Sequence, residues 1–187
     1  IVSLPWQRFL KLQVLLSELI TRDQATALEF LKILGKMASM IYVVRLARLR
    51  MHPIQLHLLC HWKPSSREYW NLIPVDEMLK RHLQWWMEPT NLSQGCPITP
   101  PLPQVTVTTD ASKGKWGAEC VGQWAQGDWT QEESGFHSNI LEMMGVIRAL
   151  RHFRTQIQNK HILVRTDNMS VCQYINKQGG TRSPSLC

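Results

Sequence analysis

Three carboxylates in the second half of the chain have residue types and surroundings suited to holding a metal ion. Asp110 follows the run Val-Thr-Val-Thr-Thr at 105–109, whose alternation has the period of a β-strand. Asp167 follows a second apolar run, at 162–166, and Glu142 lies between the two in a segment with helical character. If the strands lie together and the helix covers them, the carboxylates converge at one edge of a sheet. Hard oxygen ligands in this number select Mg²⁺ or Mn²⁺ over zinc.

Glu142 is the most informative of the three because of the helix face it shares. Gly145, Val146 and Ala149 lie three, four and seven residues further on, so this face is small and apolar and suited to lying close on a sheet. An unpaired charge on a buried face is costly, so such a glutamate needs a partner. The alternative is a glutamate at the helix rim that reaches solvent. For either aspartate alone, the alternative is a turn former or a helix N-cap.

The elements that must position these residues follow from the periodicity of the second half. Strands are predicted at 104–110, 116–121, 123–129 and 162–166. A helix from Ser138 or Asn139 to about Phe153 precedes the fourth strand, and a short helix at 168–177 follows it. Three strands, a helix, a strand and a helix predict an α/β domain with a mixed sheet.

The first half, residues 1–90, is predicted to be a small all-helical subdomain. Its helices are expected at 4–20, 24–40, 41–59 and 74–87, with Thr21 or Asp23 as N-cap of the second and a break near His52-Pro53 in the third. In the last helix, Leu79, Leu83 and Trp86 are expected to point inward. Residues 91–103 contain four prolines in the seven positions from 97 to 103, which neither a helix nor a central strand accommodates. This segment is expected to be a stiff linker and the domain boundary.

Composition narrows the class of protein. The chain has 187 residues with 44% hydrophobic and 19% charged residues, which is typical of a globular protein rather than a disordered one. It contains no apolar run of 18 residues, so no membrane partner is expected. The five cysteines are scattered and never in C-x-x-C spacing, which argues against a disulfide framework or a zinc site and favours a reducing, intracellular compartment. Because the chain opens on Ile1 and stops at Cys187, both ends are expected to be cuts through a longer polypeptide.

The basic charge favours a polyanionic partner. The formal net charge is +7 and the pI is near 9.4. Arg45, Arg48 and Arg50 form a candidate surface for phosphates, with Arg45 and Arg48 on one helix face; a solvated face of a core helix is the alternative. A basic protein with a carboxylate cluster suggests phosphodiester chemistry, in which two metal ions roughly 3.5–4 Å apart activate a water and stabilise the leaving oxygen.

The motifs around the carboxylates resemble the ribonuclease H family over residues 104 to about 180. They are Thr-Thr-Asp-Ala-Ser at 108–112 with Gly-Lys-Trp-Gly-Ala at 114–118, Asn-Ile-Leu-Glu-Met-Met at 139–144, and Ile-Leu-Val-Arg-Thr-Asp-Asn at 162–168. Shorter stretches at 38–40, 47–50, 165–168 and 176–183 resemble the polyproteins of DIRS-type retrotransposons, in which a reverse transcriptase precedes the ribonuclease H domain. By this resemblance, residues 1–90 correspond to the thumb and connection region of the reverse transcriptase.

The resemblance implies an activity, a cofactor and partners. The activity is hydrolysis of the RNA strand of an RNA–DNA hybrid, with Asp110, Glu142 and Asp167 as catalytic and metal-binding residues and two Mg²⁺ or Mn²⁺ ions in the intact domain. Ser112 and Asn168, which follow the two aspartates, are expected to contact the nucleic acid together with the three arginines. The rest of the reverse transcriptase polyprotein is the expected partner in cis.

One feature departs from the family pattern. The family has a fourth Asp after a fifth strand, whereas no Asp or Glu occurs from residue 168 to 187, and Asp128, Glu132 and Glu133 lie on the wrong segment to replace it. Residues 104–187 are therefore expected to be a ribonuclease H-like domain cut before its last strand and helix, with weak or no activity as a fragment. An Asp-Asp pair is also missing, so the polymerase metal site is absent.

Three other interpretations stay open. The chain could be a remnant that binds nucleic acid without cutting it, or another nuclease or integrase of the ribonuclease H-like fold. The third is a helical interaction module with a decayed second half, which the three intact acidic positions disfavour.

Overall fold

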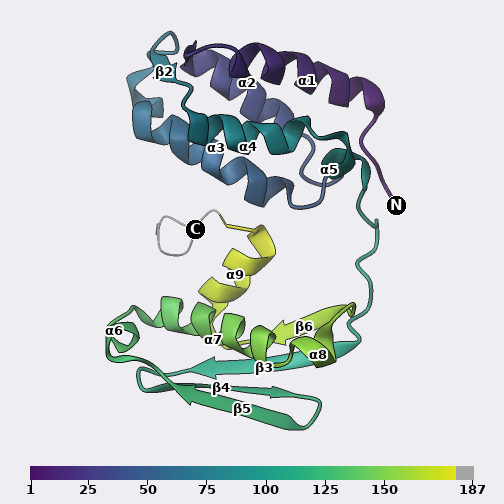
Figure 1. The fold of residues 1–187 in the computed structure, drawn as a ribbon, viewed down its shortest axis with the longest axis vertical. Helices are drawn as coiled ribbons and strands as arrows, with labels where there is room; N and C mark the ends of the chain where they lie inside the picture. Colours follow the sequence, from purple (N-terminus) through teal and green to yellow (C-terminus); the bar gives the residue numbers. More distant parts are fainter. Residues whose placement is uncertain (180–187) are drawn as a thin grey trace. The chain divides into compact units, whose positions relative to one another are not determined.

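The computed structural model describes residues 1–179 and divides the chain into two compact units, residues 1–99 and the residues from 100 onward (Figure 1). The division falls within the proline-rich segment at 91–103. The last residues of the 176–183 motif lie outside the described part. In the described part, no helix is both long enough and apolar enough to cross a membrane.

The first unit packs five helices around one apolar core. The helices are α1 (Trp6–Ile20), α2 (Ala27–Ala38), α3 (Ala47–His61), α4 (Glu77–Met87) and α5 (Pro89–Ser93), with a short 3₁₀ turn, η1 (Pro64–Ser66). The large side chains buried most completely in this core are Leu12, Leu16, Phe30, Met37, Ile54, Ile73, Leu79, Leu83, Trp86 and Leu92. The inward positions predicted for α4 are therefore confirmed.

The all-helical expectation for this unit missed a small sheet. Strands β1 (Gln24–Thr26) and β2 (Leu72–Pro74) pair antiparallel, with Ala25 opposite Ile73. Helix α2 consequently begins after β1, and its N-cap is Thr26 rather than Thr21 or Asp23. The Thr26 hydroxyl accepts from the backbone N–H of Glu29, and the Glu29 carboxylate accepts from the backbone N–H of Thr26. This reciprocal capping box fixes the helix start.

Helix α3 continues through Pro53, so the predicted break there is wrong. A proline inside a helix costs about 3 kcal/mol because it removes one backbone hydrogen bond and crowds the preceding turn. Met51, Ile54 and Leu58 are all buried in the core of the unit. Each such side chain contributes about 1.5–3 kcal/mol, so together they outweigh the cost of the proline.

The second unit is built on a four-stranded mixed sheet, as the sequence predicted. Its strands are β3 (Val105–Ala111), β4 (Lys115–Cys120), β5 (Gln123–Asp128) and β6 (Ile162–Arg165), in the spatial order β5-β4-β3-β6. Strands β3, β4 and β5 form an antiparallel meander, and β6 pairs parallel to β3. This order places β3, with Asp110, beside β6.

Helix α7 (Ser138–His152) lies against one face of this sheet (Figure 1). Leu141, Val146 and Ala149 are buried, and Gly145 brings the helix close to β3 and β4. Helix α7 starts at Ser138, one of the two predicted starts, and its N-cap is His137, whose Nδ1 accepts from the backbone N–H of Asn139.

Three shorter helices complete the described part of this unit. Helix α9 (Met169–Lys177) matches the predicted helix at 168–177, whereas α6 (Gln131–Ser134) and α8 (Arg154–Ile157) have no counterpart in the sequence analysis. Both are four residues long, too short to leave a periodic pattern.

Candidate metal and active site

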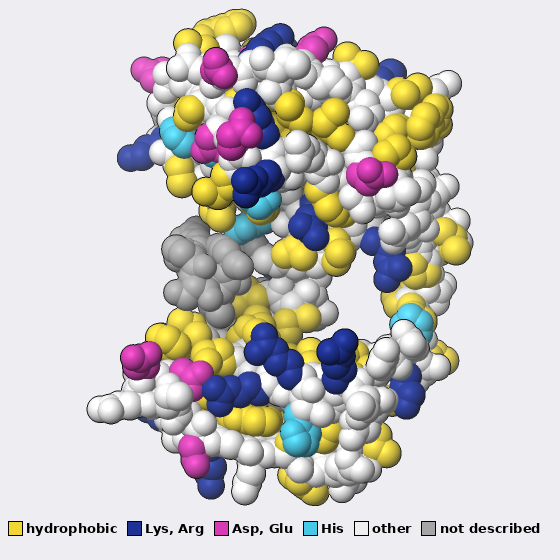
Figure 2. Space-filling model, viewed as in Figure 1, with side chains coloured by type: hydrophobic (Ala, Val, Ile, Leu, Met, Phe, Trp, Pro, Cys, Tyr) yellow, Lys and Arg dark blue, Asp and Glu magenta, His cyan; other side chains and the backbone are white. Residues whose placement is uncertain are grey.

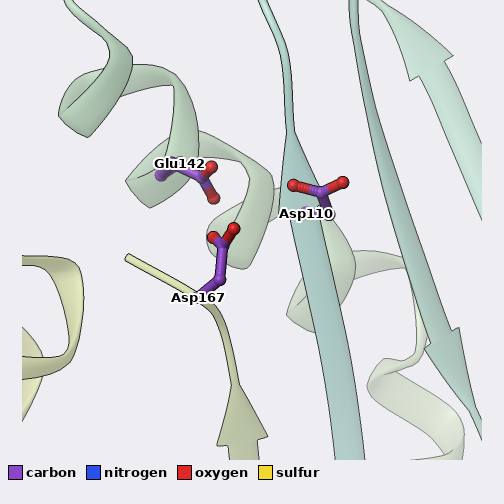
Figure 3. Close-up of side chains that lie close together, drawn as sticks. All are labelled: Asp110, Glu142 and Asp167. Atoms are coloured by element: carbon purple, nitrogen blue, oxygen red, sulfur yellow. The ribbon is translucent and has the colours of Figure 1, made fainter. Parts of the chain in front are cut away.

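The structure brings Asp110, Glu142 and Asp167 together. Each residue offers a carboxylate oxygen, and these oxygens all lie within 4.8 Å of one another. In Figure 3, Glu142 reaches from its helix toward Asp167, and the carboxylate of Asp110 lies beside the pair. The group therefore joins one strand, one helix and one strand end.

Strand register explains why the two aspartates meet. In the parallel pair, Thr108 of β3 lies opposite Arg165 of β6. Asp110 and Asp167 each follow that pair by two residues. Because β3 and β6 run parallel, the two aspartates lie at the same position along the strands. The Val-Thr alternation sets which face Asp110 takes. Val107 and Thr109 are buried on the α7 side, whereas Asp110 is exposed.

Glu142 differs from the two aspartates in its burial. The residue is 7% exposed and its Oε2 atom has no hydrogen-bond partner among the described residues. Burial raises the pKa of Glu142 above its ordinary value, and the nearby charges of Asp167 and Asp110 raise it further. An orphaned carboxylate oxygen beside two more carboxylates is what a cation would satisfy.

The donor set fits a hard divalent cation. All three residues offer oxygen, and the described residues bring no cysteine or histidine into the group. Oxygen-only coordination is typical of Mg²⁺, Mn²⁺ and Ca²⁺ rather than of zinc. The residues that the sequence analysis proposed as metal ligands therefore have a geometry compatible with that role.

Ser112 lies in the turn between β3 and β4, and its polar groups close that turn. Its backbone N–H donates to the carbonyl of Lys115 at 2.9 Å, and its hydroxyl donates to the same carbonyl at 3.2 Å. The hydroxyl also accepts from the backbone N–H groups of Gly114 and Lys115, each at 3.3 Å. A contact between Ser112 and nucleic acid stays a prediction, and it would have to compete with these bonds.

Asn168 has two structural tasks beside Asp167. Its Oδ1 accepts from the backbone N–H groups of Ser170 and Val171, at 3.0 and 3.1 Å, which caps α9. Its Nδ2 donates to Oδ1 of Asn139 on α7 at 2.9 Å. This role of Asn139 was not predicted from the sequence. Its position three residues before Glu142, on the same side of the helix, was the available signal.

The three arginines belong to the first unit, and their arrangement corrects the sequence analysis in one respect. Arg45 lies in the turn that precedes α3, so it does not share a helix face with Arg48. The Arg48 guanidinium lies 5.8 Å from the ring centroid of Tyr42, and that of Arg50 lies 5.3 Å from the ring of Trp85. None of the three forms an ion pair with a described residue.

The second unit has basic side chains of its own that the sequence analysis did not propose as contacts. Figure 2 shows Lys and Arg side chains gathered over α7, which carries Arg148 and Arg151 and is followed by Arg154.

The second unit is similar to a family of known domains. Residues 101–185 match the family described as the RNase H-like domain found in reverse transcriptase. The matched range contains all three carboxylates and every strand of the four-stranded sheet.

The curated relatives include viral polyproteins. The enzymatic polyprotein of Cauliflower mosaic virus (strain D/H) is 27% identical over 128 residues, covering 55% of this chain and 19% of the relative. That of Carnation etched ring virus is 28% identical over 146 residues, covering 72% of this chain and 20% of the relative. The chain thus spans about a fifth of the length of these relatives.

Two solved structures of foamy viral protease-reverse transcriptase are also similar. One, in complex with double-stranded DNA, has a TM-score of 0.38 and 18% identity, covering 91% of this chain and 30% of that chain. The other, in complex with an RNA/DNA hybrid, has a TM-score of 0.37 and 15% identity, covering 94% of this chain and 24% of that chain.

Proposed function

Because residues 101–185 match the RNase H-like domain found in reverse transcriptase, we propose that their carboxylate site hydrolyses the RNA strand of RNA–DNA hybrids. The observation that carries the proposal is the convergence of Asp110, Glu142 and Asp167 within 4.8 Å, inside a domain of that family. The cofactor would be Mg²⁺ or Mn²⁺. A bound divalent cation polarises a phosphodiester and lowers the pKa of water.

The three residues would contribute differently. Asp110 and Asp167 are exposed, so a phosphodiester can approach both carboxylates from solvent. Glu142 is buried and held by its helix, so its place is fixed before any ligand arrives. One rigid ligand and two accessible ones suit a site that must hold a cation and still admit a substrate.

The partner would be nucleic acid. The net charge of +7 favours a polyanion. Arg45 and Arg50 are exposed, Arg48 is half-buried, and all three lack a carboxylate partner among the described residues, so their charge is available to phosphates. Residues 1–90 would act as the thumb and connection region of a reverse transcriptase polyprotein, which we propose is of the DIRS type.

Hydrolysis by these 187 residues alone should be weak. No Asp or Glu follows Asp167 in the sequence, so the described residues supply three of the four carboxylates that the family pattern expects. Displacement of a reacting group by about 1 Å can reduce the rate roughly 100-fold. Poor placement of one cation would therefore lower the rate far more than it lowers cation affinity.

The test is cleavage of a labelled RNA–DNA hybrid with Mg²⁺ or Mn²⁺, alongside double-stranded RNA, double-stranded DNA and single-stranded RNA of the same sequence. We expect slow cleavage of the RNA strand in the hybrid alone, abolished by Asp110→Asn. Binding of the hybrid without cleavage in either metal would contradict the proposed hydrolysis. Equal cleavage of the double-stranded DNA would instead indicate another nuclease of this fold.

A second candidate function is nucleic-acid binding without catalysis. The net charge of +7 favours it, because binding of a polyanion requires charge and no catalytic group. The same assay separates the two functions, because a binding remnant would retain the hybrid and be unaffected by Asp110→Asn.

A further inference from the structure

Trp129 forms hydrogen bonds with two residues of the turn that follows β3, Ser112 and Gly114. It has no role in the proposed chemistry. Its indole N–H donates to the carbonyl of Ser112 at 2.8 Å, and its backbone N–H donates to the carbonyl of Gly114 at 3.2 Å. Its ring is buried in the core of the second unit. Since Ser112 lies two residues after Asp110, Trp129 fixes the end of the strand that carries this carboxylate.

Arg148 connects Trp129 to the helix that carries Glu142. It lies on α7, six residues after Glu142, and its guanidinium is 4.7 Å from the ring centroid of Trp129. Its Nη1 donates to the carbonyl of Asp128 at 3.3 Å, and its Nη2 donates to Oε1 of Glu133 at 2.6 Å. Arg148 therefore contacts three residues, Asp128, Trp129 and Glu133, of the segment at 128–133.

Glu133 is itself fixed. Its Oε2 accepts from the backbone N–H of Thr130 at 2.9 Å, as part of the capping box of α6. The backbone hydrogen bond from Thr130, followed by the contact with Arg148, keeps the pKa of Glu133 below its ordinary value. The carboxylate therefore stays ionised at neutral pH and retains Arg148.

These contacts form one connection from α7 to the end of β3. We propose that Trp129 and Arg148 are positioning residues that set the spacing between Asp110 and Glu142, and through it the affinity of the carboxylate site for divalent cations. The inference rests on the proposed metal site. Three carboxylates within 4.8 Å repel one another in the absence of a cation, so their spacing depends on the elements that carry them.

The expected size of the effect follows from the distance of these residues from the site. Partners that orient metal ligands directly are worth about 10- to 100-fold in metal affinity. Trp129 and Arg148 act through the backbone of the ligand-bearing elements rather than on the carboxylates. We therefore expect the low end of that range.

The test uses two conservative variants. Trp129→Phe keeps an aromatic ring under Arg148 and removes the N–H that bonds Ser112. Arg148→Lys keeps the charge and removes the planar guanidinium, which contacts the Trp129 ring, the Asp128 carbonyl and the Glu133 carboxylate together. Glu133→Gln is a third variant, at a half-buried position, and its amide oxygen can still accept from the backbone N–H of Thr130. Arg151→Lys is the matched control, because among the described residues the exposed Arg151 side chain makes no hydrogen bond or ion pair.

Urea titration would first identify a temperature at which every variant is folded. Mn²⁺ affinity would then be measured at that temperature by isothermal titration calorimetry. The expected result is a dissociation constant about tenfold higher for Trp129→Phe and Arg148→Lys, a smaller rise for Glu133→Gln and no change for Arg151→Lys. Unchanged Mn²⁺ affinity together with lower stability in EDTA would overturn the inference and leave Trp129 and Arg148 with a structural role alone. If the wild-type chain binds no Mn²⁺, the proposed metal site itself fails, and this inference with it.

Discussion

The Nδ2 of Asn168 donates a 2.9 Å hydrogen bond to Oδ1 of Asn139, which joins the residue after Asp167 to the helix of Glu142. The direction of this bond follows from the cap of α9. Because Oδ1 of Asn168 accepts from two backbone N–H groups, its Nδ2 is the group left to donate. Asn168 therefore supports the site and a helix end together.

These two tasks can be separated by mutation. Asn168→Ser keeps a cap acceptor and loses the bridge, as Asn139→Ala does from the other side. Each should lower the free energy of unfolding by about 1 kcal/mol, the value of one hydrogen bond. Asn168→Ala should lose about 1 kcal/mol more, because the cap is lost as well. Urea denaturation of the three variants measures this, and a wild-type value for Asn168→Ser would exclude a stabilising bridge.

The raised pKa of Glu142 predicts a pH-dependent stability in EDTA. A carboxyl group whose pKa is higher in the folded protein binds its proton more tightly there, so its contribution is fully present below the unfolded-state pKa. That contribution is lost as the pH rises through the higher folded-state pKa. The glutamine of Glu142→Gln cannot ionise, so its contribution does not change with pH. As the pH rises from about 4 to neutral, we therefore expect the free energy of unfolding of the wild type to fall relative to that of Glu142→Gln.

Urea denaturation at several pH values, in EDTA and in Mg²⁺, checks this expectation. Mg²⁺ should stabilise the wild type and have less effect on Glu142→Gln, because one ligand is lost. A stability difference between the two proteins that is independent of pH would contradict the assigned environment of Glu142.

Much of the second unit was predictable because its signals are local. The alternation of valine and threonine marks β3, and the small apolar face shared by Gly145 and Ala149 marks the buried side of α7. Strand ends and one covering helix then suffice to bring the three carboxylates together. The motif resemblance added the family, which spacing alone does not identify.

The features that sequence reasoning missed depend on contacts between distant segments. Pro53 predicts a helix break, but the packing of Ile54 and Leu58 against the rest of the unit overrides that local preference. Strands β1 and β2 are three residues each and separated by 45 residues, too short to show alternation. Trp129 and Arg148 likewise meet through the fold, and neither residue type signals the pairing in advance.

The phosphate-binding role of Arg45, Arg48 and Arg50 can be tested by salt dependence. Each true phosphate contact that is removed should reduce the slope of log affinity against log salt by about 0.7–0.9. The matched control is Arg22→Ala, since Arg22 already pairs with Glu29 at 2.7 Å. The measurement is fluorescence anisotropy of a labelled hybrid at several salt concentrations. If the variant with alanine at all three positions keeps the wild-type slope, these arginines form a solvated face and do not contact phosphates.

Limited proteolysis should cut the chain between residues 97 and 104. All eight residues of this stretch are exposed, and Ile98, which is 76% exposed and is followed by Thr99 rather than by proline, offers a site to proteinase K. Because each unit has its own core, both fragments should stay folded after the cut. Mass spectrometry and circular dichroism of the separated fragments check this. Resistance of the stretch, or unfolding of both fragments, would indicate one cooperative domain.

Gly145 offers a graded test of how closely α7 must approach the sheet. A Cβ added there would lie 3.5 Å from Cβ of Ala111 and 3.8 Å from Cβ of Trp116, which is ordinary contact. Gly145→Ala should therefore raise the free energy of unfolding by about 0.5–1 kcal/mol, since alanine is the better helix former, and leave Mn²⁺ affinity unchanged.

Gly145→Val adds two further methyl groups on the side that faces Ala111. It should push α7 from β3, costing about 1–3 kcal/mol and separating Glu142 from Asp110. Urea denaturation and Mn²⁺ titration of the pair give the comparison. If valine keeps the wild-type Mn²⁺ affinity despite its loss of stability, close approach of this helix is not what sets the spacing of the carboxylates.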